Sequence, residues 1–161
     1  MPSEGESVLP GEPAERVRAI LERVVIELEI DATVEVDDDD EQIVGRVEGD
    51  DVGLLIGRRG ATIDAVQLIC YRAAFLGRHD RKRVVVDAAG YRDRRREAIE
   101  RQADRAAERA LKTGREIELD PMTPTERRVV HQHLKERAGI ETFSEGEEPE
   151  RCVIVAPLLS D

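Results

Sequence analysis

The hydrophobic period of this chain changes abruptly near its N-terminal end, and that change limits the folds open to it. Between residues 14 and 28, apolar residues recur three or four positions apart, which places them on one helix face: Val17, Ile20, Leu21, Val24, Val25 and Leu28. From residue 32 the period drops to two, because Ala32, Val34 and Val36 alternate with polar residues. A second apolar stretch runs from Ile43 to Val47. The pattern predicts a helix and then a β-hairpin whose turn is the run Asp37–Asp40.

The rest of the first half returns to helical spacing before one more strand. A short helix is expected over residues 51–56, and a second helix with one apolar face begins at about residue 61. Residues 83–87 contain three consecutive valines, which is typical of a buried strand. The order α-β-β-α-α-β over residues 14–90 predicts a three-stranded sheet with helices on one face.

The second half repeats the mixture of helices and strands without repeating the sequence. A long helix with a narrow stripe of mostly alanines is expected from residue 91 to Gly114, a residue suited to a C-cap. Thr123 or Thr125 would begin the next helix, which would end near Arg137. Short strands are expected at residues 116–119, 141–144 and 152–156. Residues 91–157 therefore form a second α/β unit, and the fold class is α+β, two small two-layer domains.

Several simple features exclude whole classes of protein. Residues 1–13 are rich in Gly, Pro, Ser and Glu, which predicts a disordered acidic tail. The chain has no signal peptide pattern and no apolar run near the roughly 18 to 20 residues needed to span a bilayer, so a cytoplasmic protein without a membrane partner is expected. Cys70 falls on an apolar helix face and is expected to be a reduced, packed thiol. Residues 37–40 lack the alternating ligands of a calcium loop, so neither a metal nor a cofactor is predicted.

The formal net charge of −11 argues at first against a nucleic-acid partner, but the charge is unevenly distributed. Residues 51–115 carry 16 basic and 9 acidic side chains, a net of +7. Residues 1–50 carry a net of −12, and residues 116–161 a net of −6. A basic middle segment between acidic ends is typical of a protein that binds a polyanion. A solvent-exposed helix face balanced by its own acidic neighbours would give the same numbers of charged residues.

Residues 57–60, Gly-Arg-Arg-Gly, lie at the junction of the two expected helices of the first unit; we call them the GRRG loop. They match neither a Walker loop nor a Rossmann loop, so an NTPase or a dehydrogenase is not expected. Two glycines without Cβ atoms would let a sugar-phosphate chain touch the backbone, and the following helix N-terminus would favour an anion. Arg58 and Arg59 would flank a phosphate, and Leu55 and Ile56 would form an apolar floor. Such a loop holds several nucleotides of a single strand.

The order α-β-β-α-α-β with IGRRG at the helix junction resembles a type II KH domain. The stretch GDDVGLLIGRRGATIDAVQ is similar to the KH segment of the Jag family, also called the SpoIIIJ-associated or KhpB/EloR proteins. In the second half, TPTERRVVHQHL and TFSEGEEPERCVIV resemble the single-stranded nucleic-acid-binding domain named R-three-H for its Arg-x-x-x-His spacing. The resemblance covers residues 14–157, with both motifs in the family's order.

The Arg-x-x-x-His pair here is Arg127 and His131. Positions i and i+4 share a helix face, so the guanidinium and the imidazole could address one phosphate or two neighbouring ones. Arg128 faces away from that pair and is expected to contribute general electrostatic attraction. The resemblance places Ser144 and Arg151 in the hairpin beside the pair, which makes them supporting candidates.

The resemblance implies a non-enzymatic binder of single-stranded RNA, a post-transcriptional regulator or RNA chaperone linked to cell elongation and division, often acting with a small KH-domain partner. Members often carry an additional N-terminal Jag domain, which has no counterpart in the roughly 13 residues before the KH unit, so that domain's role is not carried over. Two alternatives remain open: the ligand is single-stranded DNA, or the chain is a protein-interaction module that pairs with another KH subunit. No paired catalytic carboxylates, nucleophile elbow or metal cluster is recognisable, so no enzymatic activity is expected.

Overall fold

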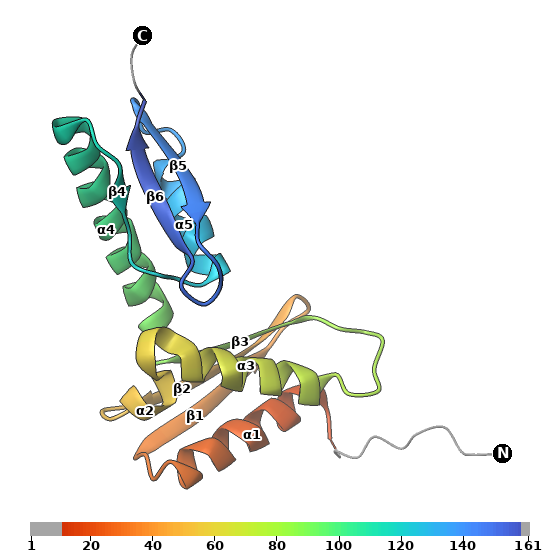
Figure 1. The fold of residues 1–161 in the computed structure, drawn as a ribbon. Coiled ribbons are helices and arrows are strands. Elements are labelled where there is room, and N and C mark those ends of the chain that lie inside the picture. Colours follow the sequence, from red (N-terminus) through yellow and green to blue (C-terminus); the bar gives the residue numbers. More distant parts are fainter. Residues whose placement is uncertain (1–10, 159–161) are drawn as a thin grey trace. The chain divides into compact units, whose positions relative to one another are not determined.

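The computed structural model describes residues 11–158 of the chain. These divide into two compact units, with the boundary between Arg92 and Asp93. Each unit is described below by itself. The helices and strands are labelled in Figure 1. None of the described helices is long and apolar enough to cross a membrane.

The first unit contains the predicted order of helices and strands. Helix α1 spans Pro13–Glu27, and strands β1 (Ala32–Asp38) and β2 (Gln42–Gly49) form an antiparallel hairpin. Helix α2 (Gly53–Ile56), a single 3₁₀ turn η1 (Arg58–Gly60) and helix α3 (Ala61–Ala74) follow. Strand β3 (Arg83–Ala88) pairs in parallel with β2, which gives the sheet order β1-β2-β3. The α-β-β-α-α-β prediction is confirmed.

Helices α1 and α3 cover one face of this sheet, as Figure 1 shows. The side chains between them are mostly aliphatic, as the low aromatic content requires, and many are inaccessible to solvent. They include Val17 and Leu21 of α1, Ile43 and Val47 of β2, and Ile63 of α3. Their alternation along β2 follows the two-residue period read from the sequence.

The hairpin turn lies slightly beyond the predicted position. Strand β1 continues to Asp38, and the turn is made by residues 39–41. The Asp39 carboxylate accepts the backbone N–H groups of Glu41 and Gln42, each at 2.8 Å. These two hydrogen bonds hold the pKa of Asp39 below its usual value, and the bond from Gln42 has the larger effect. The aspartate is therefore explained by turn formation, and no metal-binding group of side chains is present among the described residues.

Helix α1 begins at Pro13, one residue inside the segment for which a disordered tail was predicted. Proline is well suited to the first turn of a helix, because the N–H that it lacks would have no intrahelical partner there. Arg16, which is buried, donates through Nε to the carbonyl of Gly11 at 3.0 Å. Residues 1–10 of the predicted tail lie outside the described residues.

The second unit contains the long helix α4 (Tyr91–Thr113), whose first two residues belong to the first unit. Strand β4 (Ile117–Glu118), helix α5 (Pro124–Leu134) and strands β5 (Ile140–Glu145) and β6 (Cys152–Pro157) follow. The strands form an antiparallel sheet in the order β4-β6-β5. Helix α5 begins with a capping box, because Thr123 and Glu126 each accept the other's backbone N–H. It ends at Leu134 rather than near Arg137, because the chain tightens into turns after it.

Both cysteines are free and buried, as predicted for Cys70. Burial raises the pKa of the Cys70 thiol to about 12. Burial is also the main cause of the raised pKa of Cys152, helped by the nearby carboxylate of Glu118. Both thiols are therefore protonated at neutral pH; Cys70 packs as a small apolar side chain, whereas the thiol of Cys152 donates to Oε1 of Glu118 at 3.6 Å.

Candidate nucleic-acid interface

The GRRG loop is a sharply turned segment between α2 and α3. Gly57 has φ 72° and ψ −179°, a combination that is essentially confined to glycine. A Cβ added there would lie 2.1 Å from Oγ1 of Thr62. Gly60 is left-handed, with φ 80° and ψ 10°, and an added Cβ would lie 2.8 Å from the ring of Tyr91. The fold itself therefore requires both glycines, whereas the sequence had suggested that they leave room for a ligand.

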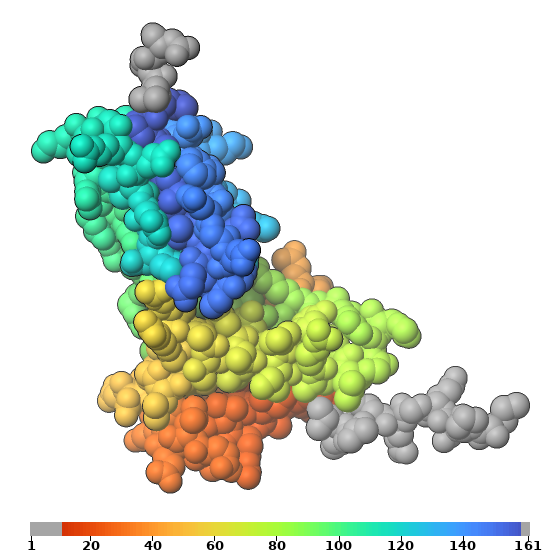
Figure 2. Space-filling view, viewed as in Figure 1, coloured from red at the N-terminus to blue at the C-terminus, as the bar shows by residue number. Residues whose placement is uncertain are grey.

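The two arginines between these glycines are exposed to solvent. Arg59 has φ 54° and ψ 28°, a left-handed conformation that costs a non-glycine residue about 1 kcal/mol. No acidic side chain of the described residues forms an ion pair with Arg58. In Figure 2 the yellow segment that contains this loop lies at the surface of its unit. The loop therefore presents two cations on a backbone that the surrounding structure fixes.

The apolar residues beside the loop differ from those expected. Leu55 is fully buried in the core and cannot floor a groove, and Ile56 is half-buried. Leu54 is instead 62% exposed, and Leu68 and Ile69 of α3 are more than half exposed. For Leu54 the signal was present in the doublet Leu54-Leu55, since two successive residues of a helix do not share a face.

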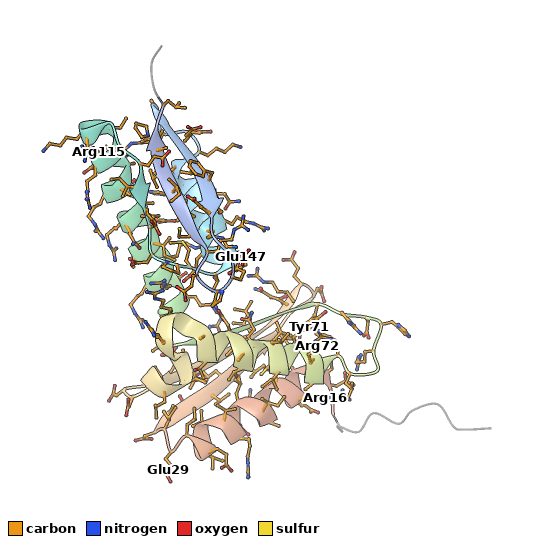
Figure 3. All side chains as sticks on the ribbon, in the orientation of Figure 1. Arg16, Glu29, Tyr71, Arg72, Arg115 and Glu147 are labelled. Atoms are coloured by element: carbon orange, nitrogen blue, oxygen red, sulfur yellow. The ribbon has the colours of Figure 1, made fainter. Side chains whose placement is uncertain are left out.

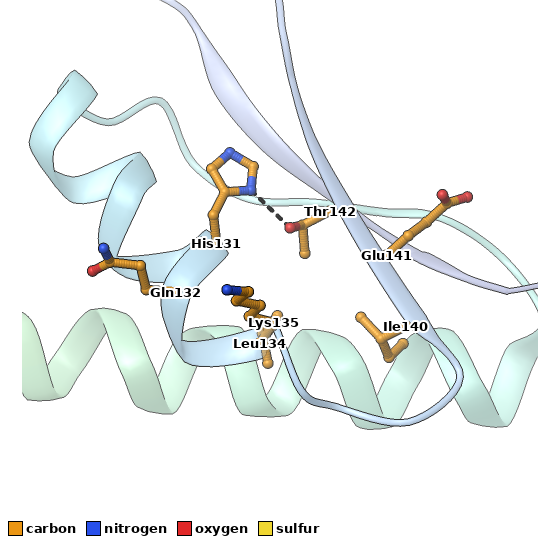
Figure 4. Close-up of a pocket in the computed structure, with 7 residues that line it drawn as sticks. All are labelled: His131, Gln132, Leu134, Lys135, Ile140, Glu141 and Thr142. Carbon is orange, nitrogen blue, oxygen red and sulfur yellow. Dashed lines mark hydrogen bonds between the residues drawn. The ribbon is translucent and has the colours of Figure 1, made fainter.

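A second group of polar side chains lies between α5 and β5; we call His131, Thr142 and Ser144 the His131 cluster. Nδ1 of His131 lies 2.7 Å from Oγ1 of Thr142, and Nε2 lies 3.1 Å from Oγ of Ser144. Thr142 and Ser144 are two positions apart on β5, so their side chains share one face of the strand. The first of these contacts is drawn in Figure 4. Each hydroxyl can donate or accept, so the cluster satisfies the imidazole in either tautomer.

Arg127 is buried, whereas His131 is only partly buried. Its side chain is only 10% exposed, Nη1 donates to the carbonyl of Met122 at 2.7 Å, and Nη2 donates to Oε1 of Glu148 at 2.5 Å. Glu148 lies in the β5–β6 connection and is itself half exposed. The prediction that both side chains are presented together to a phosphate therefore differs from the structure. The i, i+4 spacing does place both on one helix face, but at Arg127 that face packs against protein.

The other two arginines predicted for this site have different surroundings. Arg128 is exposed, and no acidic side chain among the described residues pairs with it. Arg151, just before β6, has a buried Nε that makes no hydrogen bond within residues 11–158. A buried, unpaired guanidinium N–H is costly, so this group is suited to donating to an additional oxygen ligand.

A shallow pocket of about 440 Å³ opens beside His131. Figure 4 shows its lining residues. Leu134 and Ile140, both buried, supply apolar surface, while Gln132, Lys135 and Glu141 supply polar groups. The sequence analysis did not identify Lys135 or Thr142. Lys135 lies at i+4 from His131, so the helical spacing that linked Arg127 to His131 could have found it.

The pKa of His131 lies below its ordinary value of 6.5, mainly because the ring is partly buried and also because the Arg127 charge is near. Folding therefore favours the neutral imidazole. The resulting stabilisation is fully present above pH 6.5 and is lost as the pH falls from there through the folded-state pKa.

We expect the thermal unfolding midpoint to decrease as the pH falls below about 6.5, the ordinary pKa of histidine, and His131→Gln to reduce that pH dependence. Circular dichroism melts of both proteins across the pH range test this expectation. Identical pH profiles for the two proteins would show that His131 is not the group responsible.

Comparison with known protein families gives two matches. Residues 14–88 match the family described as the KH domain of KhpA/KhpB, and residues 97–157 match the family described as the R-three-H domain. The two matches cover separate parts of the chain and lie in the two units of the structure.

Curated relatives match across both units. The RNA-binding protein KhpB of Clostridium symbiosum is 37% identical over 127 residues, which is 79% of this chain and 57% of the relative. That of Lactiplantibacillus plantarum is 36% identical over 83% of this chain and 41% of the relative. That of Bacillus subtilis is 29% identical over 90% of this chain and 71% of the relative. The chain thus spans about half the length of the first two relatives.

Proposed function

Because this chain joins a KH domain of the KhpA/KhpB family to an R-three-H domain, we propose that it binds single-stranded RNA through both domains. The observation that carries the proposal is the GRRG loop, which holds two exposed arginines on a fixed turn at the surface. Curated relatives over most of the chain bear the name RNA-binding protein.

At the KH domain, the RNA backbone lies against the GRRG loop. Arg58 and Arg59 make charge-assisted contacts to phosphate oxygens. Ile56 and the exposed Leu54 offer apolar surface to a base beside those phosphates. Gly57 and Gly60 act indirectly, because they make the turn that presents the arginines.

At the R-three-H domain, the single-stranded RNA lies over the His131 cluster. The imidazole of His131 uses both ring nitrogens on Thr142 and Ser144, and the hydroxyl that accepts its N–H keeps its own O–H to donate to a sugar or phosphate oxygen. Arg128 contributes an accessible positive charge, and Arg151 contributes its unpaired Nε–H. Arg127 positions the β5–β6 connection through Glu148 and reaches a phosphate only when that carboxylate moves.

Glu148 therefore competes with RNA for Arg127. We expect Glu148→Gln to increase RNA affinity about threefold, because the amide holds the guanidinium less strongly than the carboxylate does. Glu147→Gln, at the exposed neighbouring position, is the matched control for the change in net charge. Affinities that rise equally in both variants would attribute the gain to net charge alone.

Linking two modest sites on one chain raises the effective concentration of the second once the first is occupied. The proposed role is that of a post-transcriptional regulator or RNA chaperone in the cytoplasm, linked to cell elongation and division. It involves no catalysis, so incubation with divalent metal leaves the bound RNA intact.

A second function is favoured by a different observation, the apolar stripe on α3. Leu68, Ile69 and Leu76 are each about half exposed on this helix or just after it. Such a face suits a protein partner, which in this family context would be a small KH-domain protein. Light scattering distinguishes the two functions, since a dimer that forms without RNA and ignores it would favour the interaction module.

The proposed RNA binding is tested by fluorescence anisotropy with a labelled, unstructured single-stranded RNA over a salt series. We expect saturable binding that weakens as salt increases. A DNA strand of the same sequence measures the preference for RNA. Absence of binding at low salt would overturn the proposal.

A further inference from the structure

We propose that the solvent face of helix α4 is an additional binding surface for the RNA backbone, separate from the GRRG loop and the His131 cluster. The surface consists of Arg101, Arg105, Arg109 and Lys112, and we call it the α4 ridge. This inference rests on the proposed RNA-binding function.

The spacing of these residues forms a continuous row. Positions 101, 105, 109 and 112 are separated by three or four residues, so their side chains follow one another along one side of the helix. With a rise of about 1.5 Å per residue, successive cations lie about 6 Å apart along the axis, and the row extends about 16 Å. Arg94 lies on the same side nearer the start of the helix, and Arg115 follows just past its end. Figure 3 labels Arg115.

The opposite side of α4 fixes the direction in which the ridge faces. Five of its apolar residues are buried in the second unit's core, Ile99, Ala103, Ala106, Ala107 and Ala110, whereas Leu111 beside them is about half exposed. Alanines let the helix pack closely against its neighbours, so it cannot rotate without opening that core. The cations are therefore held in solvent by the packing behind them.

The charges of the ridge are poorly compensated within the protein. Within residues 11–158, no carboxylate forms an ion pair with Arg105, Arg109 or Lys112. Arg101 pairs with Glu97 at 3.4 Å, but both side chains are more than 60% exposed, so the pair contributes little. Glu108 lies beside the row without forming an ion pair among the described residues. Many other arginines do have carboxylate partners: Arg23, Arg46, Arg78, Arg92, Arg95, Arg127 and Arg137.

A row of poorly compensated cations on a chain with net charge −11 fits a polyanion. An anionic membrane is less suitable, because a membrane-surface helix inserts its apolar face, and that of α4 is already buried in the protein. The ridge offers no aromatic surface for bases, so it contacts phosphates without reading sequence.

The test is the salt dependence of binding to an unstructured RNA, about 30 nucleotides long, by the full chain. Each phosphate contact to a single strand contributes about 0.7 to the slope of log K against log salt. We expect Arg105→Gln/Arg109→Gln/Lys112→Gln to reduce that slope by about 2. Glutamine is a good helix former, so α4 is retained, which circular dichroism verifies.

Two further variants make the result specific. Arg18→Gln/Arg23→Gln/Arg83→Gln removes the same charge from exposed positions elsewhere and should keep nearly the wild-type slope. Arg105→Lys/Arg109→Lys keeps the charges and should retain it as well. A wild-type slope in the ridge variant, or an equal loss in the control, would overturn this inference alone. Failure of the wild-type chain to bind RNA would overturn the proposed function together with it.

Discussion

Reversing both charges of the GRRG loop, with Arg58→Asp/Arg59→Asp, should lower the affinity for single-stranded RNA by about two orders of magnitude. Charge-assisted hydrogen bonds contribute about 1.5 kcal/mol or more each, and two lost contacts correspond to about 3 kcal/mol of binding free energy. Anisotropy titrations of wild type and variant with the same RNA measure the loss directly.

The fold should survive this change. Both side chains are exposed, and aspartate adopts the left-handed conformation of residue 59 more readily than most residues. The unfolding midpoint is therefore expected to stay close to that of wild type. A matched control, Arg81→Asp/Arg83→Asp, makes the same charge change at exposed positions outside the loop. Equal affinities for wild type and the loop variant would show that RNA does not use the GRRG loop.

The largest effect on stability is expected for Gly57→Ala. Alanine would have to adopt a backbone conformation that is essentially confined to glycine, at a cost of about 1 to 3 kcal/mol. Its Cβ would also overlap the side chain and backbone nitrogen of Thr62, which adds a similar overpacking cost. We expect a loss of about 3 kcal/mol in the free energy of unfolding, measured by urea denaturation.

Gly53→Ala is the matched control, four residues earlier in the same segment. A Cβ at Gly53 meets nothing within 4 Å, and alanine favours a helix over glycine by up to about 1 kcal/mol. We therefore expect this variant to be as stable as wild type or slightly more stable. If Gly57→Ala were equally harmless, the described conformation of the loop would be wrong.

The element order was predictable because local hydrophobic period determines it. The drop from helical spacing to alternation at Ala32 and the valine run before Asp87 both reflect burial within a single element. Element ends were less predictable. Strand β1 extends to Asp38 because Asp39, rather than the whole aspartate run, supplies the turn's hydrogen bonds.

The orientation of single side chains depended on contacts between distant residues, which spacing does not encode. Arg127 is on the face predicted for it, yet Met122 and Glu148 surround its guanidinium. Gly60 is explained by the ring of Tyr91, which follows much later in the chain. Leu55, which was expected to line a groove, is buried in the core of the first unit, and its neighbour Leu54 is exposed instead.

The most direct test of RNA binding at both candidate sites is an NMR titration of the ¹⁵N-labelled full chain with a short single-stranded RNA. We predict that amide signals shift at residues 57–61 of the GRRG loop and at His131, Thr142 and Ser144. Shifts confined to other surfaces, or unchanged signals at residues 57–61 when the RNA is saturating, would contradict the account.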